Sequence, residues 1–371
     1  MTASLQAKRT GAHPGATGYS GTTGLPRSSH RPPARRGRNV RVLGIAACAI
    51  ALVAASICSI VFGVRDVPLE DVWNALVHGG THSGAQGIEA ATVLSRVPTT
   101  VAGILVGMAL GIGGALMQGV TRNPLADPGL LGINSGAALF VVIGMTFLGV
   151  GSAIGTVWFA FAGAAVAAVA VYAVASAGRR GATPFALALA GAAVTAAASS
   201  ITLGVLLTHV NSLDSYRFWQ IGSISAPSWN TVLLLAPFIV AGVVLALMQG
   251  PALNALTLGD DLARGLGHRV GLSRALAAIA VVLLCGAATA MAGPIAFVGL
   301  AVPHAARLVF GADYRWLLPA SALLGGVLLL GADVIGRLVA RPSTVEVGVV
   351  VVVIGAPVLI ALVRRTKGVA L

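Results

Sequence analysis

Apolar runs long enough to cross a membrane recur along this chain from residue 42 onward. A helix of about 20 residues spans a hydrocarbon core of about 30 Å. Only 9% of the residues are charged, against about 25% in a typical soluble domain. We therefore predict an all-α polytopic membrane protein with about ten transmembrane helices. The spans are expected near residues 42–63, 97–118, 129–149, 152–177, 184–207, 230–249, 274–293, 295–311, 317–338 and 346–363.

The positions of Lys and Arg predict the side of the membrane on which each loop lies. With the N-terminus inside, 19 of the 24 basic residues fall in cytoplasmic segments and five fall outside. Cytoplasmic loops carry an excess of Lys and Arg, so this orientation is favoured and the opposite one is rejected. Both termini are then cytoplasmic.

Residues 1–41 differ in composition from the rest of the chain, because they are rich in Pro, Gly, Ser and Arg. Such a segment has too few apolar residues to bury a core, so we predict a disordered basic cytoplasmic tail followed by a transmembrane domain over 42–371. The first apolar run starts too far along the chain and is too long for a cleaved signal peptide. The basic tail is expected to bind anionic lipid at the cytoplasmic surface and so to maintain the orientation of the protein in the membrane. Binding of a specific partner is the alternative.

Several features of the spans limit the functional class. Gly103, Gly107 and Gly111 lie on one helix face, where small residues allow two helices to approach closely. Ionisable residues within spans are few; Asp333 and Arg337 are spaced to pair on one face. A proton-coupled carrier usually needs more such groups. The sequence also lacks the Gly-Lys-Ser/Thr ending of a phosphate-binding loop, so we predict no nucleotide site, no enzymatic activity and no cofactor in this chain.

One polar segment, LGDDLARGLGHRVG at 258–271, interrupts the apolar runs on the cytoplasmic side. Leu258, Leu262 and Leu266 recur every fourth residue and form an apolar stripe on a helix. Asp260 and Arg264 have the favourable acid-first spacing, and Gly265 then ends the helix. Two interpretations remain open: a solvated loop that returns the chain to the membrane, or a docking helix for a soluble partner.

This segment resembles the cytoplasmic coupling segment of the permease subunits of ABC importers for iron–siderophore, haem and vitamin B12, the FecCD family. Other resemblances follow in the family's order from about residue 96 to 363. They are RVPTTVAGILVGMALGIGGALMQGVTRNPLADPGLLGINSGAAL at 96–139, GPIAFVGLAVPHAARLVFG at 293–311, LLPASALLGGVLLLGADVIGRL at 317–338 and IGAP at 354–357.

The resemblance implies a type II ABC importer permease in the bacterial plasma membrane. Its partners would be a second permease subunit, identical or similar, two cytoplasmic ATPase subunits and an extracytoplasmic binding protein; no nucleic acid is expected. The coupling segment would cover about 250–273 and sit in a cleft of the ATPase. Its contact residues would be Leu258, Gly259, Asp260, Asp261, Leu262, Arg264, Leu266 and Gly267.

Family permeases also present arginines to acidic residues of the binding protein, and Arg96, Arg337 and Arg341 are the candidates here. Two departures from the family pattern affect this surface. Thr99 stands where a second Arg is common, and residues 344–348 read TVEVG where Glu-x-Pro-x-Gly is common. The docking surface is therefore expected to differ in detail.

Residues for the translocation path or its gate are Gln118, Asn123, Pro124, Thr195, Ser199 and Ser200. Asn-Pro and Asp-Pro disfavour helix continuation, so the chain is expected to turn sharply after the second span. Two interpretations of this turn remain open: a purely structural corner, or a part of the inner gate. Hydroxyl groups in a span can also bond back to their own helix. No catalytic residue and no metal site is predicted.

The function expected from these observations is the import of a ferric siderophore. Vitamin B12 or haem import by the same machinery is the alternative. A secondary transporter is less favoured because it needs a coupling-ion site near mid-membrane, and a channel needs a polar or charged ring that is not evident.

Overall fold

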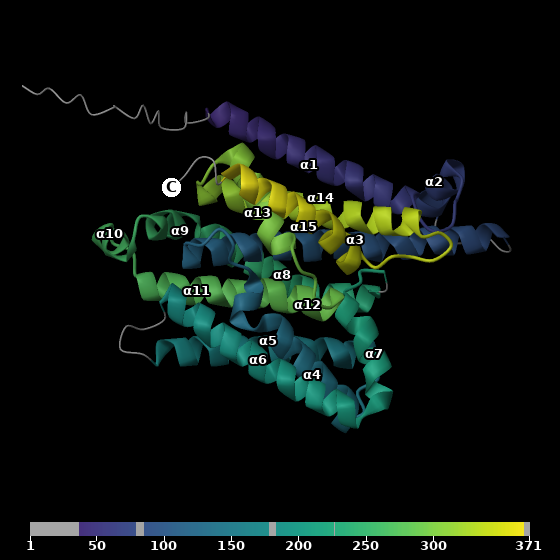
Figure 1. The fold of residues 1–371 in the computed structure, drawn as a ribbon. Helices are drawn as coiled ribbons and strands as arrows, with labels where there is room; N and C mark the ends of the chain where they lie inside the picture. Colours follow the sequence, from purple (N-terminus) through teal and green to yellow (C-terminus); the bar gives the residue numbers. More distant parts are fainter. Residues whose placement is uncertain (1–36, 79–84, 178–182, 226, 367–371) are drawn as a thin grey trace, which may run out of the picture. The chain divides into compact units, whose positions relative to one another are not determined.

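The computed structural model describes residues 37–78, 85–177, 183–225 and 227–366. The elements of these ranges are helices, which Figure 1 shows in order along the chain. They are α1 (Arg38–Val61), α2 (Leu69–His78), α3 (Ala85–Thr121), η1 (Pro128–Leu131), α4 (Ile133–Phe147), α5 (Ala153–Ser176), α6 (Pro184–Thr208), α7 (Val210–Ile221), α8 (Trp229–Met248), α9 (Gly250–Thr257), α10 (Asp260–Gly265), α11 (Val270–Val281), η2 (Val282–Gly286), α12 (Ala287–Ala292), α13 (Val298–Phe310), α14 (Tyr314–Val339) and α15 (Val347–Thr366).

The predicted all-α polytopic fold is confirmed. Within the described ranges, seven helical segments are long and apolar enough to cross a membrane, and α4, α13 and α15 contain shorter apolar stretches at the three remaining predicted spans. One span joins α11 and α12 through η2, a turn of π-helix. Each predicted span overlaps one of these helices. The predicted tail lies outside the described residues as far as residue 36, and α1 begins at Arg38 rather than near residue 42.

Two helices, α2 and α7, were not predicted. Both are too short to cross the bilayer, and both carry polar residues between apolar ones. Such helices do not stand out as long apolar runs in the sequence. They lie on the outer side, in the connections between α1 and α3 and between α6 and α8.

Helix α3 is the centre of the packing and touches α1, α8, α13 and α14 (Figure 1). Its 37 residues make it about 55 Å long, so its outer end extends beyond a hydrocarbon core of about 30 Å. There, Ala90 and Val93 of α3 are buried against Val72 and Ala75 of α2. The outer end of α3 thus supports α2.

Glycines let the backbone of α3 lie directly against its neighbours. A Cβ at Gly107 would lie 2.4 Å from the carbonyl oxygen of Gly325 in α14, and one at Gly114 would lie 1.9 Å from that of Gly299 in α13. Only a residue without a side chain fits such contacts. The predicted small-residue face is confirmed at Gly107, and the structure extends it to Gly114.

Gly114→Ala should lower the free energy of unfolding by about 1–3 kcal/mol, the usual cost of overpacking, because the added methyl group meets the backbone of Gly299. Gly331→Ala in α14 is the matched control, since nothing lies within 4 Å of its Cβ position. Thermal unfolding of the purified protein measures both. Equal melting temperatures for the two variants would contradict this account of the packing.

Candidate functional site

The predicted coupling segment, about 250–273, folds into two short helices, α9 and α10, and its role stays a prediction. Gly259 (φ 114°) separates them, and Gly267 (φ 85°) ends the segment in a conformation that L side chains rarely adopt. The leucines predicted to form one helical stripe are 58–63% exposed. The single helix was wrong, because the chain breaks at Gly259: Leu262 lies within α10, and Leu258 and Leu266 flank it. Apolar side chains that the protein itself leaves uncovered can bind a partner.

Asp260 ties α10 to the membrane-spanning helices. Its carboxylate pairs with Arg122 at the inner end of α3 and accepts a hydrogen bond from Arg274 of α11 at 3.0 Å. Arg264 of α10 lies 4.0 Å from its second oxygen. Arg274 is 9% exposed, so this charge interaction is weakly screened by solvent. The three arginines and one carboxylate fix the orientation of α10.

A second carboxylate anchors α9. Asp313, the N-cap of α14, accepts a hydrogen bond from Asn254 of α9 at 2.7 Å. Asn254 in turn accepts one from the backbone N–H of Tyr314 at 2.9 Å. Arg41 of α1 lies 3.5 Å from the same aspartate. The segment is therefore attached to α3, α11 and α14.

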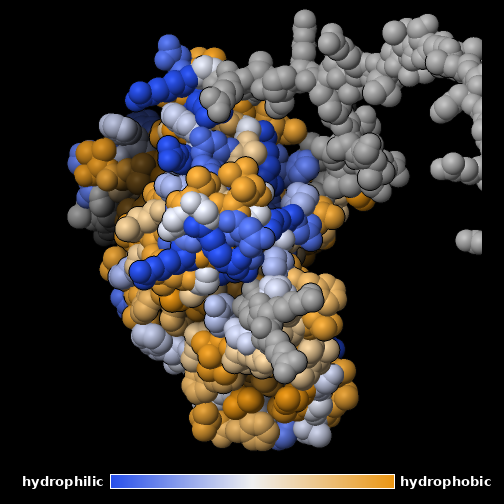
Figure 2. Space-filling model, turned by 90° about the vertical axis from the view of Figure 1, so that its left-hand side faces the viewer, coloured by the Kyte–Doolittle hydropathy of each residue, from blue (hydrophilic) through white to orange (hydrophobic). Residues whose placement is uncertain are grey.

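Figure 2 shows the molecule from the side on which α9 and α10 lie. Hydrophilic residues gather into a patch there, and apolar surface borders it. The side of the molecule that carries α9 and α10 is therefore largely polar.

The corner after α3 is built by two side-chain turns. Asn123 accepts a hydrogen bond from the N–H of Leu125 at 2.9 Å, and Asp127 accepts one from Gly129 at 2.8 Å. Each of these acceptors precedes a proline, as expected where the chain cannot continue as a helix. Burial raises the pKa of the Asp127 carboxyl, and its hydrogen bond from Gly129 opposes that rise. The structural corner is therefore seen directly, whereas a gating role of Asn123 and Pro124 stays a prediction.

Gln118 joins α3 to α13. Pro303 lacks the N–H that would bond the carbonyl of Gly299 four residues earlier, and the side-chain amide of Gln118 donates to that carbonyl at 3.1 Å. The Gln118 carbonyl oxygen accepts from Arg307, which also donates to the Tyr314 hydroxyl at 3.4 Å. Gln118 is buried. Its contacts are those of a structural bridge, and its part in the path or gate stays a prediction.

On the outer side, Arg96 of α3 caps the C-terminal end of α1. Its guanidinium donates to the carbonyls of Ile60 and Val61 at 2.8 Å each, and to that of Arg65 at 2.8 Å. The last carbonyls of a helix have no partner within the helix, and a positive charge near them is favourable. Arg96 thus fixes the direction in which the chain leaves α1.

Arg337, near the C-terminal end of α14, and Arg341, just after it, also donate hydrogen bonds to the segment around the end of α1. Arg337 donates to the carbonyl of Ser59 at 3.0 Å and pairs with Asp333, as the sequence predicted. Arg341 donates to the carbonyl of Gly63 at 2.7 Å. The three arginines predicted to dock a partner therefore converge on residues 59–65, which we call the α1 exit.

The side chains of these arginines differ in exposure. Arg96 and Arg337 are 6% and 7% exposed, while Arg341 is more accessible and pairs with Asp66 at 2.7 Å. Their docking role is not tested by this arrangement and stays a prediction. A cavity of about 270 Å³ does open beside them. Its lining consists of Gly63, Val64, Arg65, Thr92, Ser95, Arg96, Thr99, Ser225, Arg337 and Thr344. We call it the outer hollow.

The hydroxyl residues predicted for the path lie on α6 beside α4. Ser135 of α4 donates to Thr195 at 3.3 Å. Ser199 and Thr202 line a cavity of about 270 Å³ together with Tyr216 of α7. Ser200 is exposed. The structure thus brings Ser199 to a cavity and Thr195 to a helix contact, and the path assignment stays a prediction.

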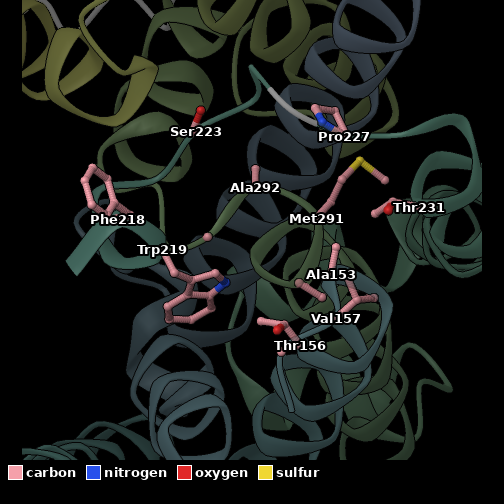
Figure 3. Close-up of a pocket in the computed structure, with 13 residues that line it drawn as sticks. Ala153, Thr156, Val157, Phe218, Trp219, Ser223, Pro227, Thr231, Met291 and Ala292 are labelled. Atoms are coloured by element: carbon pink, nitrogen blue, oxygen red, sulfur yellow. The ribbon is translucent and has the colours of Figure 1, made fainter. Parts of the chain in front are cut away.

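Another cavity, of about 340 Å³, lies among α5, α7, α8 and α12. Figure 3 shows Trp219 from α7, Thr156 from α5, and Thr231 and Met291 around it. No sequence pattern indicates this cavity, because its lining comes from the ends of four separate helices.

Similarity to known proteins identifies the family of this chain. The profile of the FecCD transport family matches residues 51–365. The chain belongs to the FecCD transport family. It is 44% identical over 331 residues to the ferric enterobactin transport system permease protein FepD of Escherichia coli K12, covering 88% of this chain and 97% of FepD. It is 40% identical over 321 residues to the probable siderophore transport system permease protein YfiZ of Bacillus subtilis 168, covering 86% and 95%.

A further relative of this FecCD-family protein is the hemin transport system permease protein HmuU of Yersinia pestis, 36% identical over 278 residues, covering 73% of this chain and 82% of HmuU. The solved inward-facing structure of a metal-chelate type ABC transporter has the same fold, with a TM-score of 0.76 at 23% identity, over 86% of this chain and 98% of that one. The family and the membrane location expected from the sequence are confirmed.

Several residues of this FecCD-family protein that hold the coupling segment were not singled out from the sequence. They are Arg122, Asn254, Arg274 and Asp313. A weak signal existed for Asn254, a polar residue in the apolar stretch PALNAL, and for Asp313, which directly precedes a helix. Arg122 and Arg274 pair with Asp260 of α10, and Asn254 bonds Asp313. Both sets of contacts depend on the tertiary structure.

Asp260→Asn should loosen α10, because the amide carries no charge to pair with Arg122 and Arg274. We expect amide exchange at residues 263–268 to rise about tenfold, which corresponds to about 1.4 kcal/mol. Asp261→Asn is the matched control, since the Asp261 side chain is 99% exposed and surface ion pairs contribute little. Hydrogen–deuterium exchange measures both variants, and equal rates would show that Asp260 does not anchor the helix.

Proposed function

We propose that this chain is the membrane permease of an ATP-driven importer for ferric siderophores. The observation that carries the proposal is the predicted coupling segment: three exposed leucines in and beside α10, a helix whose orientation is fixed by Asp260. The names of the relatives FepD and YfiZ refer to ferric enterobactin and siderophore transport. A segment that is exposed and also anchored can pass a movement of a soluble partner to the spans.

The expected partner on the cytoplasmic side is a pair of ATPase subunits. Leu258, Leu262 and Leu266 would enter an apolar cleft of one ATPase, and the charges around them would set the register of docking. A movement of α10 would reach α3 and α11 through Asp260, and α14 through the link between α9 and Asp313. ATP hydrolysis in this proposal belongs to the ATPase subunit.

On the outer side, the outer hollow is the proposed docking point for an extracytoplasmic binding protein. Arg65, Arg96 and Arg337 contribute positive charge to its lining, and Thr92, Ser95 and Thr99 contribute hydroxyl groups. This combination suits a carboxylate side chain of the partner. Arg341, more exposed at the same end of the molecule, would add to the attraction.

The path is proposed to lie between this chain and a second permease subunit. Helix α6 supports this, because it leaves many apolar residues exposed together with Ser199 and Ser200. A bulky chelate that passes without being trapped needs weak contacts, which small hydroxyl groups and apolar side chains provide. Import of vitamin B12 or haem would use the same features, and relatives with cobalamin and hemin in their names exist.

Uptake of labelled substrates tests the proposal. A strain without this chain is given radiolabelled iron as a panel of ferric siderophores, with labelled cobalamin and haem in parallel. We expect the loss of uptake of one siderophore, restored by the intact chain. Leu262→Glu should restore less than about a tenth of it, because a charge among the exposed leucines opposes burial in the partner. Leu262→Met, which keeps the same position apolar, should restore it fully.

The outcomes separate the alternatives. A defect confined to cobalamin or haem keeps the importer and changes its cargo. Uptake that persists in the Leu262→Glu strain after ATP depletion would exclude an ATP-driven importer. Immunoblots of the membrane fraction establish that each variant is inserted at the normal level.

Ser95→Trp tests the outer hollow. Ser95 is exposed at its lining, so the indole would fill the hollow without disturbing buried contacts. We expect the affinity for the binding protein to fall at least about tenfold, a loss of about 1.4 kcal/mol. Ala91→Trp, one turn earlier on α3 and outside the lining, should change it less than twofold. Similar affinities for both variants in a surface-binding assay would move the docking point elsewhere.

A further inference from the structure

Helix α2 has two apolar faces, and only one of them is used within the protein. Val72 and Ala75 pack against α3. Leu69, Trp73 and Leu76 lie on another face and are exposed, Trp73 by 67%. Glu70 and Asp71 supply polar positions between them. A second apolar face on a helix outside the spans needs a partner of its own.

This second face forms one wall of a groove. The other wall is the outer end of α1, and the groove encloses about 590 Å³. Its lining residues are Ile57, Ile60, Val61, Leu69, Glu70, Val72, Trp73 and Leu76, all apolar except one. The polar exception, Glu70, is exposed to the surroundings.

The groove is continuous with the lipid-facing surface of the protein. Helix α1 is a membrane span with only 6% of its apolar window buried, and its exposed residues Ile50, Val53 and Ile57 lead along the helix to the groove. Because α1 crosses the bilayer, these side chains face acyl chains. The connection from Val61 to Leu69 is short, so α2 starts close to the level at which α1 leaves the hydrocarbon.

We propose that α2 lies in the outer membrane interface and that the groove between α1 and α2 binds an acyl chain of an outer-leaflet phospholipid. Tryptophan concentrates at this level of a bilayer, and an amphipathic helix there places its apolar face into the headgroup–acyl boundary. Trp73 lines the groove. The bound chain holds α2 and, through it, the outer end of α3.

The site has a consequence for the outer surface. Ile60 and Val61 line the groove, and their carbonyls are the ones that Arg96 holds. Gly63, Val64 and Arg65, which follow them, line the outer hollow. One short segment, the α1 exit, therefore connects the lipid site to the hollow. A lipid bound in the groove would therefore hold the α1 exit, and with it the outer hollow, at a fixed distance from the membrane surface.

Trp73 is a built-in probe of the groove. The full chain is placed in nanodiscs of phosphatidylcholine or of phosphatidylcholine brominated on its acyl chains, and the emission of Trp73→Phe is subtracted from that of the intact protein. We expect the bromines to quench the Trp73 component by at least half, and acrylamide in water to quench it weakly. Strong quenching by acrylamide, or none by either agent, would overturn the proposal, because Trp73 would then face water or protein.

A second pair of variants tests the groove itself. Leu76→Asn makes its lining polar and should reduce the bromine quenching of Trp73 by about half. Val77→Asn is the matched control, because Val77 is exposed on α2 but does not line the groove. Equal quenching in the two variants would show that lipid contacts Trp73 without occupying the groove. Both substitutions are on exposed positions of one helix, so the fold is expected to persist.

Discussion

The close approach of the α3 backbone to α13 and α14 is the constraint on which the rest of this structure depends. In lipid, helices gain little from hiding apolar surface, so van der Waals packing and hydrogen bonds hold them together. Gly107 and Gly114 bring carbonyls of two neighbours to the surface of α3. Gln118, one turn further, then bonds the carbonyl of Gly299 that Pro303 leaves without a donor. Close packing and hydrogen bonding support one another along a single helix.

Because α3 is fixed in this way, it links the two faces of the membrane. Arg122 at its inner end pairs with Asp260 of the coupling segment, and Arg96 near its outer end holds the carbonyls of α1. The outermost turns of α3 support α2, whose remaining apolar face is proposed to bind lipid. A shift of the coupling segment is thereby connected to the outer surface through one helix of 37 residues.

The arginines show how far a sequence can predict a site. Arg96, Arg337 and Arg341, predicted as docking residues, all reach the α1 exit, and the pairing of Asp333 with Arg337 follows from their spacing on one helix. The carbonyls that these arginines bind were not predictable. They belong to a helix end that is distant in the sequence, and every residue has a carbonyl. In the predicted coupling segment, likewise, the leucines are evident from the sequence, whereas the pairing of Asp260 with Arg122 and Arg274 is not.

The sequence by itself determined the helical membrane class and the approximate positions of the apolar helices, since the bilayer demands long apolar runs, and it predicted their orientation from the asymmetry of basic residues. Only the tertiary structure decided the positions of α2 and α7, the burial of Arg96 and Arg337, and the structural bridge at Gln118. These depend on contacts between residues far apart in the chain. Helical periodicity is a local property, but a hydrogen-bond partner is chosen by whichever backbone the packing brings within reach.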